Sequence, residues 1–173
     1  GTQLLLRNPL VQSGGGIGGA INLEATHGDI SVGNIRSLSE TADGGRIDLN
    51  ANNNIITGLI NSSSVQGNGG DVNLNAISGE ISTFSLDTSS FDGDGGSVEM
   101  KALGDITTKA EMMTDSGEFL VNDYGYVENS SGGSGNAGNI KIESTEGSID
   151  TKAGSISARS VSGKGGEISI STI

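Results

Sequence analysis

The sequence predicts an all-β fold, a right-handed parallel β-helix (β-solenoid) of about five to six coils with three short strands per coil. Three observations support this prediction. Glycine supplies 30 of the 173 residues, and the chain has one Pro and no Trp. Apolar and polar residues alternate with a period of two, which is typical of strands with one buried face. A glycine-rich turn also recurs six times, mostly at intervals of 25–28 residues.

The glycine turns mark where successive coils begin. Their final glycines are 26, 25, 26, 42 and 28 residues apart, which places the repeats near residues 19, 45, 70, 96, 138 and 166 of one domain spanning 1–173. The long interval equals one repeat plus about 16 residues, so we expect an insertion at about 111–135. Glycine suits such corners because it accepts a positive φ and lets two backbones approach closely.

The first strand of each coil follows its glycine turn. Apolar residues occupy the second and fourth positions after the final glycine, and a small residue occupies the sixth, where we expect a tight corner. The two apolar columns are Ile21, Ile47, Val72, Val98, Ile140 and Ile168, and Leu23, Leu49, Leu74, Met100, Ile142 and Ile170. The residues between them are polar, so each segment is expected to bury one face.

Two further strands complete each coil. The second has an isoleucine column, followed two residues later by Val or Thr directed inward or to a corner: Ile30, Ile55, Ile81, Ile106 and Ile149, then Val32, Thr57, Thr83, Thr108 and Thr151. The third column is looser and comprises Ile35, Ile60, Leu86, Met112 and Ile156, with Leu38, Val65, Phe91 and Val161 as candidate partners. A β-sandwich is the alternative, but hairpins do not require the same residue type at one offset in successive repeats.

Composition argues against several classes of function. Nine basic and 21 acidic residues give a net charge of −12, so we expect no nucleic-acid partner, and anionic membranes would repel the chain. A membrane-spanning helix needs about 20 consecutive apolar residues. No apolar run in the sequence approaches this length, so no membrane insertion is expected. The absence of Cys excludes disulfides, and His27 is the only histidine, so a catalytic triad cannot form within the chain. We place His27 at a corner.

Two stretches show the repeat unit most clearly, GNGGDVNLNA at 67–76 and GNAGNIKIES at 135–144, and Gly-x-Ile-x-Thr follows at 79–83, 104–108 and 147–151. These columns resemble the β-helical repeat regions of filamentous-haemagglutinin-like exoproteins, particularly the large cyanobacterial kind. The resemblance covers roughly Gly14 to the end. It implies two-partner secretion across the outer membrane and a secreted or cell-surface location, in adhesion or an extracellular matrix layer.

The leading hypothesis is therefore a non-catalytic structural or adhesive segment of a surface filament or adhesin. We expect it to be a fragment of a longer solenoid or to stack end to end with copies of itself, because open coil ends expose apolar faces. A cell-surface glycan or protein is the other expected partner. The alternatives are a carbohydrate-active enzyme resembling polysaccharide lyases or hydrolases, and a glycan-binding module. Glu80 and Asp105 would be the enzyme's carboxylate pair, although a solvated acidic face is favoured and no catalytic residue is assigned.

The remaining hypotheses concern ligands. Weak calcium binding is the only cofactor hypothesis, since calcium prefers carboxylate oxygens. Asp92–Gly96 resembles a calcium loop but lacks its third alternating ligand, so a plain turn is favoured. The insertion at 111–135 contains Phe119, Tyr124 and Tyr126, which we predict to be recognition residues because exposed Tyr suits contacts with sugars and proteins. The alternative is a short hairpin or flap that covers the core.

Overall fold

The computed structural model describes residues 4–6, 10–13, 16–121 and 127–173. The described residues form strands, turns and bends, with no helix, and most strands belong to three parallel sheets of six strands each. Each coil contributes one strand to each sheet, so the chain is a β-solenoid of about six turns. This confirms the predicted fold class.

The three sheets are named here in the order in which the chain visits them. Sheet A contains β1 (Leu4–Leu6), β4 (Ile30–Val32), β7 (Ile55–Thr57), β10 (Ile81–Thr83), β13 (Ile106–Thr108) and β18 (Ile149–Asp150). Sheet B contains β2 (Leu10–Ser13), β5 (Ile35–Ser39), β8 (Leu59–Asn61), β11 (Ser85–Asp87), β14 (Met112–Met113) and β19 (Ile156–Ser157). Sheet C contains β3 (Ile21–Ala25), β6 (Ile47–Ala51), β9 (Val72–Ala76), β12 (Val98–Ala102), β17 (Ile140–Ser144) and β20 (Ile168–Thr172).

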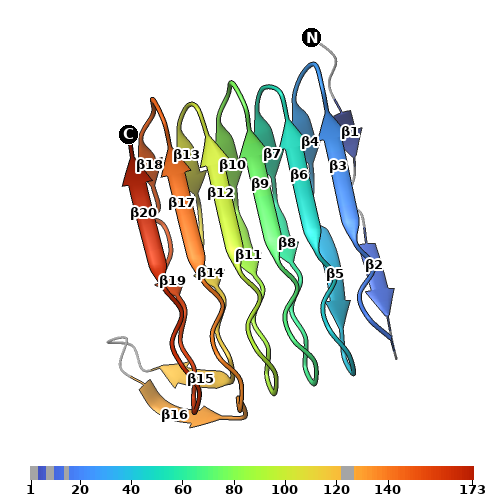
Figure 1. Cartoon of the computed structure of the whole chain (residues 1–173), viewed down its shortest axis with the longest axis vertical. Coiled ribbons are helices and arrows are strands. Elements are labelled where there is room, and N and C mark those ends of the chain that lie inside the picture. The colour runs from blue at the N-terminus through green and yellow to red at the C-terminus, as the bar shows by residue number, and fades with distance from the viewer. Residues whose placement is uncertain (1–3, 7–9, 14–15, 122–126) are drawn as a thin grey trace.

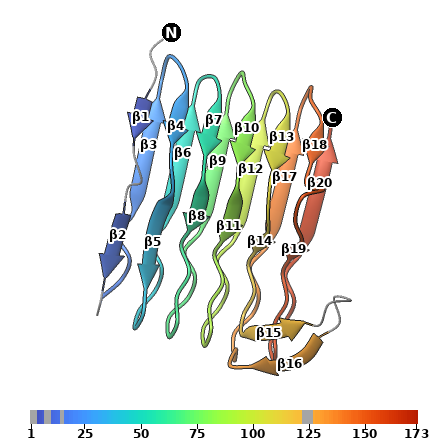
Figure 2. The same ribbon diagram turned by 180° about the vertical axis from the view of Figure 1, so that it is seen from behind.

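The coil is flattened and right-handed. In Figure 1 the strands of sheet C face the viewer and run upward, and the chain then passes over the top and descends through sheets A and B behind. Successive coils move from right to left, which makes the turn right-handed. Figure 2 shows sheets A and B from the other side, one above the other, so that two thin layers enclose the core.

Neighbouring coils are stacked in register. Ile47 lies opposite Ile21 and Val72, and the same one-to-one pairing continues along sheet C. The isoleucine column of sheet A pairs in the same way from Ile30 to Ile149. Most members of these columns are buried, and so are Thr57, Thr83 and Thr108, which confirms that the Val/Thr column points inward. Because each coil is thin, its core is complete only when coils lie above and below it.

The third column is confirmed, but its candidate partners are not part of the core. Ile35, Ile60, Leu86, Met112 and Ile156 pair in sheet B. In contrast, Val65 is 48% exposed and Phe91 is 37% exposed, while Leu38 and Val161 are half-buried. Leu38 alternates with the buried Ser37 and Ser39 of β5 and so faces outward. Val65 and Phe91 each follow a buried serine that bridges neighbouring coils, in the turn after sheet B.

The prediction that the repeat glycines adopt a positive φ is wrong, whereas the predicted close approach of two backbones is confirmed. Among the described glycines, φ is positive only at Gly117, Gly132 and Gly133, none of which belongs to the six repeat turns. The repeat glycines instead provide space. A Cβ on Gly96 would lie 2.4 Å from the carbonyl oxygen of Gly70 in the preceding coil, while Gly96 N donates to Thr88 O across its own turn at 2.8 Å. No side chain fits between backbones this close.

The insertion is shorter than the range 111–135. Met112 pairs with Leu86 and Ile156, and Ser116 bridges Ser90 and Ser160, so residues up to 116 follow the ordinary path of a coil. The inserted residues form an antiparallel hairpin of β15 (Glu118–Val121) and β16 (Val127–Ser131), at the lower edge of Figure 1. The predicted range is too long because the apolar columns alone do not mark the serine that closes each coil.

Candidate functional site

A serine ladder closes the corner between sheets B and C. Each ladder serine donates its hydroxyl to a carbonyl in the turn that begins its own coil, as Ser90 does to Gly67 O at 2.6 Å. Each except Ser116 is also seen to accept a backbone N–H three residues later, as Ser90 does from Gly93 N at 2.8 Å. The ladder contains Ser39, Ser64, Ser90, Ser116 and Ser160. Each of these serines except Ser116, which precedes the insertion, lies six residues before the final glycine of the next turn, so an alignment of polar positions would have found the ladder.

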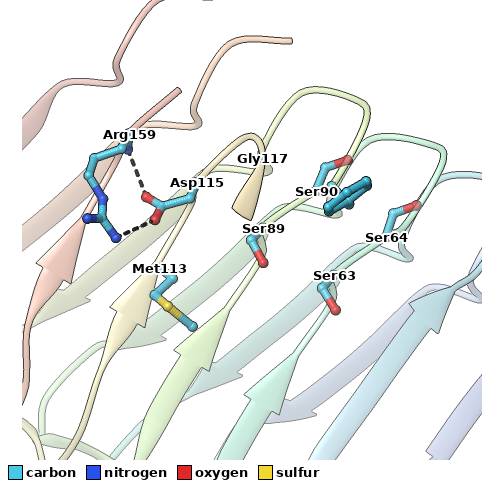
Figure 3. Close-up of a pocket in the computed structure, with 9 residues that line it drawn as sticks. Ser63, Ser64, Ser89, Ser90, Met113, Asp115, Gly117 and Arg159 are labelled. Carbon is cyan, nitrogen blue, oxygen red and sulfur yellow. Dashed lines mark hydrogen bonds and ion pairs between the residues drawn. The ribbon is translucent and has the colours of Figure 1, made fainter. Parts of the chain in front are cut away.

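A groove of about 450 Å³ lies beside this ladder, on the outer side of the turn after sheet B. Residues from four successive coils line it, from Ser63 in the first of them to Arg159 in the last. Figure 3 shows its two ends, with the serines of two coils at one end and a paired Asp115 and Arg159 at the other. It is the candidate site because it brings aromatic, hydroxyl and charged groups together at one surface.

Asp115 and Arg159 form a closed network at one end of the groove. Asp115 is only 4% exposed, and its Oδ2 accepts from Arg159 Nη2 at 3.1 Å. Its Oδ1 accepts from Arg159 N at 2.7 Å and from Ser157 Oγ at 2.6 Å. Burial of a carboxylate is tolerable here because an opposite charge and three hydrogen bonds satisfy it. Both residues directly precede a ladder serine, so the stacking register makes them neighbours despite a separation of 44 positions in the sequence.

Ser63 and Ser89 occupy the same column in the two preceding coils. The Ser63 hydroxyl donates to Asn61 Oδ1 at 2.8 Å, and the Ser89 hydroxyl donates to Asp87 Oδ1 at 2.5 Å. Asn61 Nδ2 in turn donates to Asp87 Oδ2 at 3.3 Å. The hydroxyl protons are therefore committed within the protein, whereas each hydroxyl oxygen retains lone pairs that can accept a hydrogen bond from a ligand.

The base of the inserted hairpin borders the groove beside Phe91. The chain leaves the coil at Gly117, φ 93°, and returns through Gly132 and Gly133, φ 68° and 66°. A Cβ on Gly132 would lie 2.9 Å from the ring of Phe91, and Gly133 N donates to Phe91 O at 2.5 Å. Gly117 follows its ladder serine where the preceding coil has Phe91, so the lack of a side chain there leaves space beside the aromatic ring.

Of the predicted recognition residues, only one falls in a described strand. Phe119 belongs to β15 and pairs through its backbone with Ser130 of β16, and its side chain lies outside the described groups. Tyr124 and Tyr126 lie outside the described residues. The hairpin alternative is confirmed for the backbone of the insertion. The recognition role of Phe119, Tyr124 and Tyr126 stays a prediction.

The carboxylate pair considered for catalysis lies at the corner before sheet A. Asp105 accepts from Ser148 N at 2.7 Å and from its hydroxyl at 2.9 Å, and these bonds, the backbone bond first, lower the pKa of Asp105 below its ordinary value. A general acid requires a raised pKa. Glu80 on the preceding coil donates its backbone N–H to Asn54 Oδ1 at 2.9 Å. Both residues thus belong to a column of corner hydrogen bonds.

The stretch Asp92–Gly96, which resembles a calcium loop in sequence, is also a corner. Asp94 Oδ1 accepts the backbone N–H of Asn136 in the next coil at 2.6 Å, as the predicted plain turn would allow. Among the residues that the structure describes, no three His, Asp or Glu side chains converge as a metal site would require. Weak calcium binding stays a prediction. His27 lies in the exposed turn between β3 and β4, next to Thr26 Oγ1 at 3.0 Å, which confirms a corner residue.

No protein family, curated protein or solved structure matches the chain. Within the described ranges there is also no helix with the length and hydropathy of a membrane span.

Proposed function

We propose that the chain is a non-catalytic structural and adhesive segment of a secreted or cell-surface β-solenoid. The observation that carries this proposal is the unbroken stack, in which every coil supplies hydrogen-bond partners to the next one. Such a stack has no intrinsic end, because a further coil can always add the same contacts. This property suits a molecule that spans distance or builds a filament.

One column shows how the coils template one another. Asp43 Oδ1 accepts the backbone N–H of Asn68 at 2.7 Å, and Asn68 Oδ1 accepts that of Asp94 at 2.9 Å. The series continues from Asp94 to Asn136 and from Asn136 to Lys164 N at 3.0 Å. Each side chain caps a backbone group that the strand ladder does not reach, so the corners, like the sheets, are hydrogen-bonded from coil to coil. A recurrent Asp or Asn at this position serves the rod as a whole.

The amino-acid composition supports an extracellular location. A chain without Cys depends on no disulfide or thiol and is stable to changes in redox conditions. Its net charge of −12 disfavours side-by-side association of such rods. The resemblance of the repeat units to filamentous-haemagglutinin-like exoproteins supports export by a two-partner route and adhesion at the cell surface.

The proposed partner along the axis is another solenoid segment, either further coils or a second copy. β20 is the outermost strand of sheet C, and its inward residues Ile168 and Ile170 are 44% and 46% exposed. The equivalent residues one coil earlier, Ile140 and Ile142, are buried. A coil placed on β20 would bury this apolar area and pair the strand edge.

One experiment distinguishes the proposed adhesive function from the enzymatic alternative. The purified chain is incubated with a panel of neutral and acidic polysaccharides, and both retention of the chain on the polysaccharide and release of reducing ends or unsaturated uronides are measured. We expect saturable retention without turnover. Turnover that disappears in Asp105→Asn would overturn the proposal in favour of a carbohydrate-active enzyme.

A further inference from the structure

We propose that the groove between Phe91 and the Asp115–Arg159 pair is a binding subsite for an uncharged sugar chain. The inference rests on the proposed adhesive function and names its ligand class. Three properties of the groove support it: a fixed aromatic ring, hydroxyl groups that can only accept, and a charged pair that is already neutralised.

The aromatic ring is held in place at the surface. Phe91 is 37% exposed, and its backbone N–H donates to Ser64 O at 3.1 Å while its carbonyl accepts from Gly133. Gly132 lies against the ring edge, since a Cβ there would be 2.9 Å from two ring atoms. A ring with one covered edge and an exposed remainder offers an apolar platform. The C–H face of a pyranose ring is a flat apolar surface that matches it.

The polar groups of the groove select a ligand that donates hydrogen bonds. The Ser63 and Ser89 hydroxyls already donate to Asn61 and Asp87, so toward a ligand they are acceptors. Ser90, one of the ladder serines, both donates and accepts within its corner, which leaves the outward pair to meet the ligand. A sugar carries several hydroxyl donors around an apolar face, and it therefore satisfies both requirements at once.

The charge and shape of the groove narrow the class of sugar ligand further. Asp115 is neutralised by Arg159, and Asp87 places a carboxylate beside the column of Ser63 and Ser89. With a net charge of −12, the chain disfavours anionic polysaccharides. The groove crosses four coils, which lie about 4.8 Å apart, and its volume of about 450 Å³ falls within the range of ligand sites. An extended, uncharged oligosaccharide fits this geometry.

The test is calorimetric titration of the whole chain with cellohexaose, maltohexaose and chitohexaose, and with hexagalacturonate as an anionic comparator. We expect binding of at least one uncharged hexasaccharide and weaker binding of hexagalacturonate. Phe91→Ala should weaken binding about tenfold, because a stacked aromatic contact contributes up to about 1.5 kcal/mol. Phe84→Ala is the matched control, since Phe84 is 54% exposed but lies outside the groove.

A second pair of variants tests the polar side of the subsite. Ser89→Ala removes one acceptor and should weaken binding about fivefold, whereas Ser82→Ala, on the outer face of sheet A, should leave it unchanged. Failure of all three uncharged hexasaccharides to bind, or equal effects of Phe91→Ala and Phe84→Ala, would overturn the subsite. Retention on polysaccharide that persists unchanged in Phe91→Ala would overturn the subsite alone and leave the adhesive function standing.

Discussion

At the residue scale, the fold depends on a few positions where backbones of neighbouring coils nearly touch. The final glycine of each turn is such a position, and all six repeats have Gly there. Its role is steric, because a Cβ would lie 2.5 Å or less from a carbonyl oxygen of the preceding coil at five of the six positions, Gly45, Gly70, Gly96, Gly138 and Gly166. The corner Asp and Asn residues have a complementary role, since they bond backbone groups that face the gap between two turns.

Replacement of Gly96 by Ala tests the steric requirement. The new Cβ would approach Gly70 O to 2.4 Å, and only a shift of backbone could relieve the contact. We expect Gly96→Ala to reduce the free energy of unfolding by about 3 kcal/mol in chemical denaturation. Gly165→Ala is the control, because the nearest atom to its Cβ is Ala158 O at 3.3 Å. Equal stability of the two variants would contradict the steric account.

The corner hydrogen bonds are tested at Asp94. Asp94→Asn retains the side-chain oxygen and places there the residue type already found at Asn68 and Asn136, so its unfolding free energy should stay within about 0.5 kcal/mol. Asp94→Ala removes the acceptor of Asn136 N and should cost about 1 kcal/mol. Thermal unfolding of both variants measures the difference. If the alanine variant is as stable as the asparagine variant, the corner bond contributes nothing to the stack.

At the scale of elements, the strands and the repeat turns were predictable, whereas contacts and boundaries at the insertion were not. Strand columns such as Ile30 to Ile149 stand out because inward positions require apolar residues with a period of two. The Asp115–Arg159 pair could not be predicted in this way, since its partners are joined only by the stacking register across the insertion. The hairpin boundaries depend on Gly117 and Gly132, whose positive φ values have no counterpart among the described glycines of the other repeats.

Removal of the hairpin tests whether it is an addition to a complete coil. Deleting residues 118–133 joins Gly117 to Ser134 and gives the corner Ser116-Gly117-Ser134-Gly135, which matches Ser90-Phe91-Asp92-Gly93 of the preceding coil. We expect the shortened chain to unfold cooperatively at nearly the same temperature. Deletion of 111–135, which removes β14 as well, should prevent folding of this coil. A shortened chain that loses binding to its natural surface but keeps its stability would support a recognition role for Phe119, Tyr124 and Tyr126.

The corner at Asp105 predicts a dependence on pH. Hydrogen bonds from Ser148 lower the pKa of Asp105 below its ordinary value of 3.8, so their contribution to stability is present above that pH and is lost as the pH falls through the folded value. Asp105→Asn keeps a neutral acceptor, which is weaker than a carboxylate. Thermal unfolding should show the variant as less stable at pH 6, with the gap closing in acid. A constant gap would contradict the assignment.

At the scale of the whole molecule, the length of the chain determines how many coils are stacked and therefore how long the rod is. The low apolar content that would be marginal for a globule suffices because nearly all inward positions of each thin coil are apolar or small. The sequence could predict this architecture from its period alone, whereas the groove arises from residues of four coils and could be recognised only in three dimensions. The proposed function follows the same division, with extension assigned to the repeat and recognition to the places where coils differ.

The most direct test of the central claim, that the coils form an extendable rod, is electron microscopy of the purified chain over a range of concentrations. We predict particles of constant width that lengthen by end-to-end addition as concentration rises. Ile170→Lys, which charges the apolar edge of β20, should shorten them, and Ser169→Lys on the outer face of the same strand should not. Particles of a single length at every concentration, unchanged by either substitution, would contradict the claim.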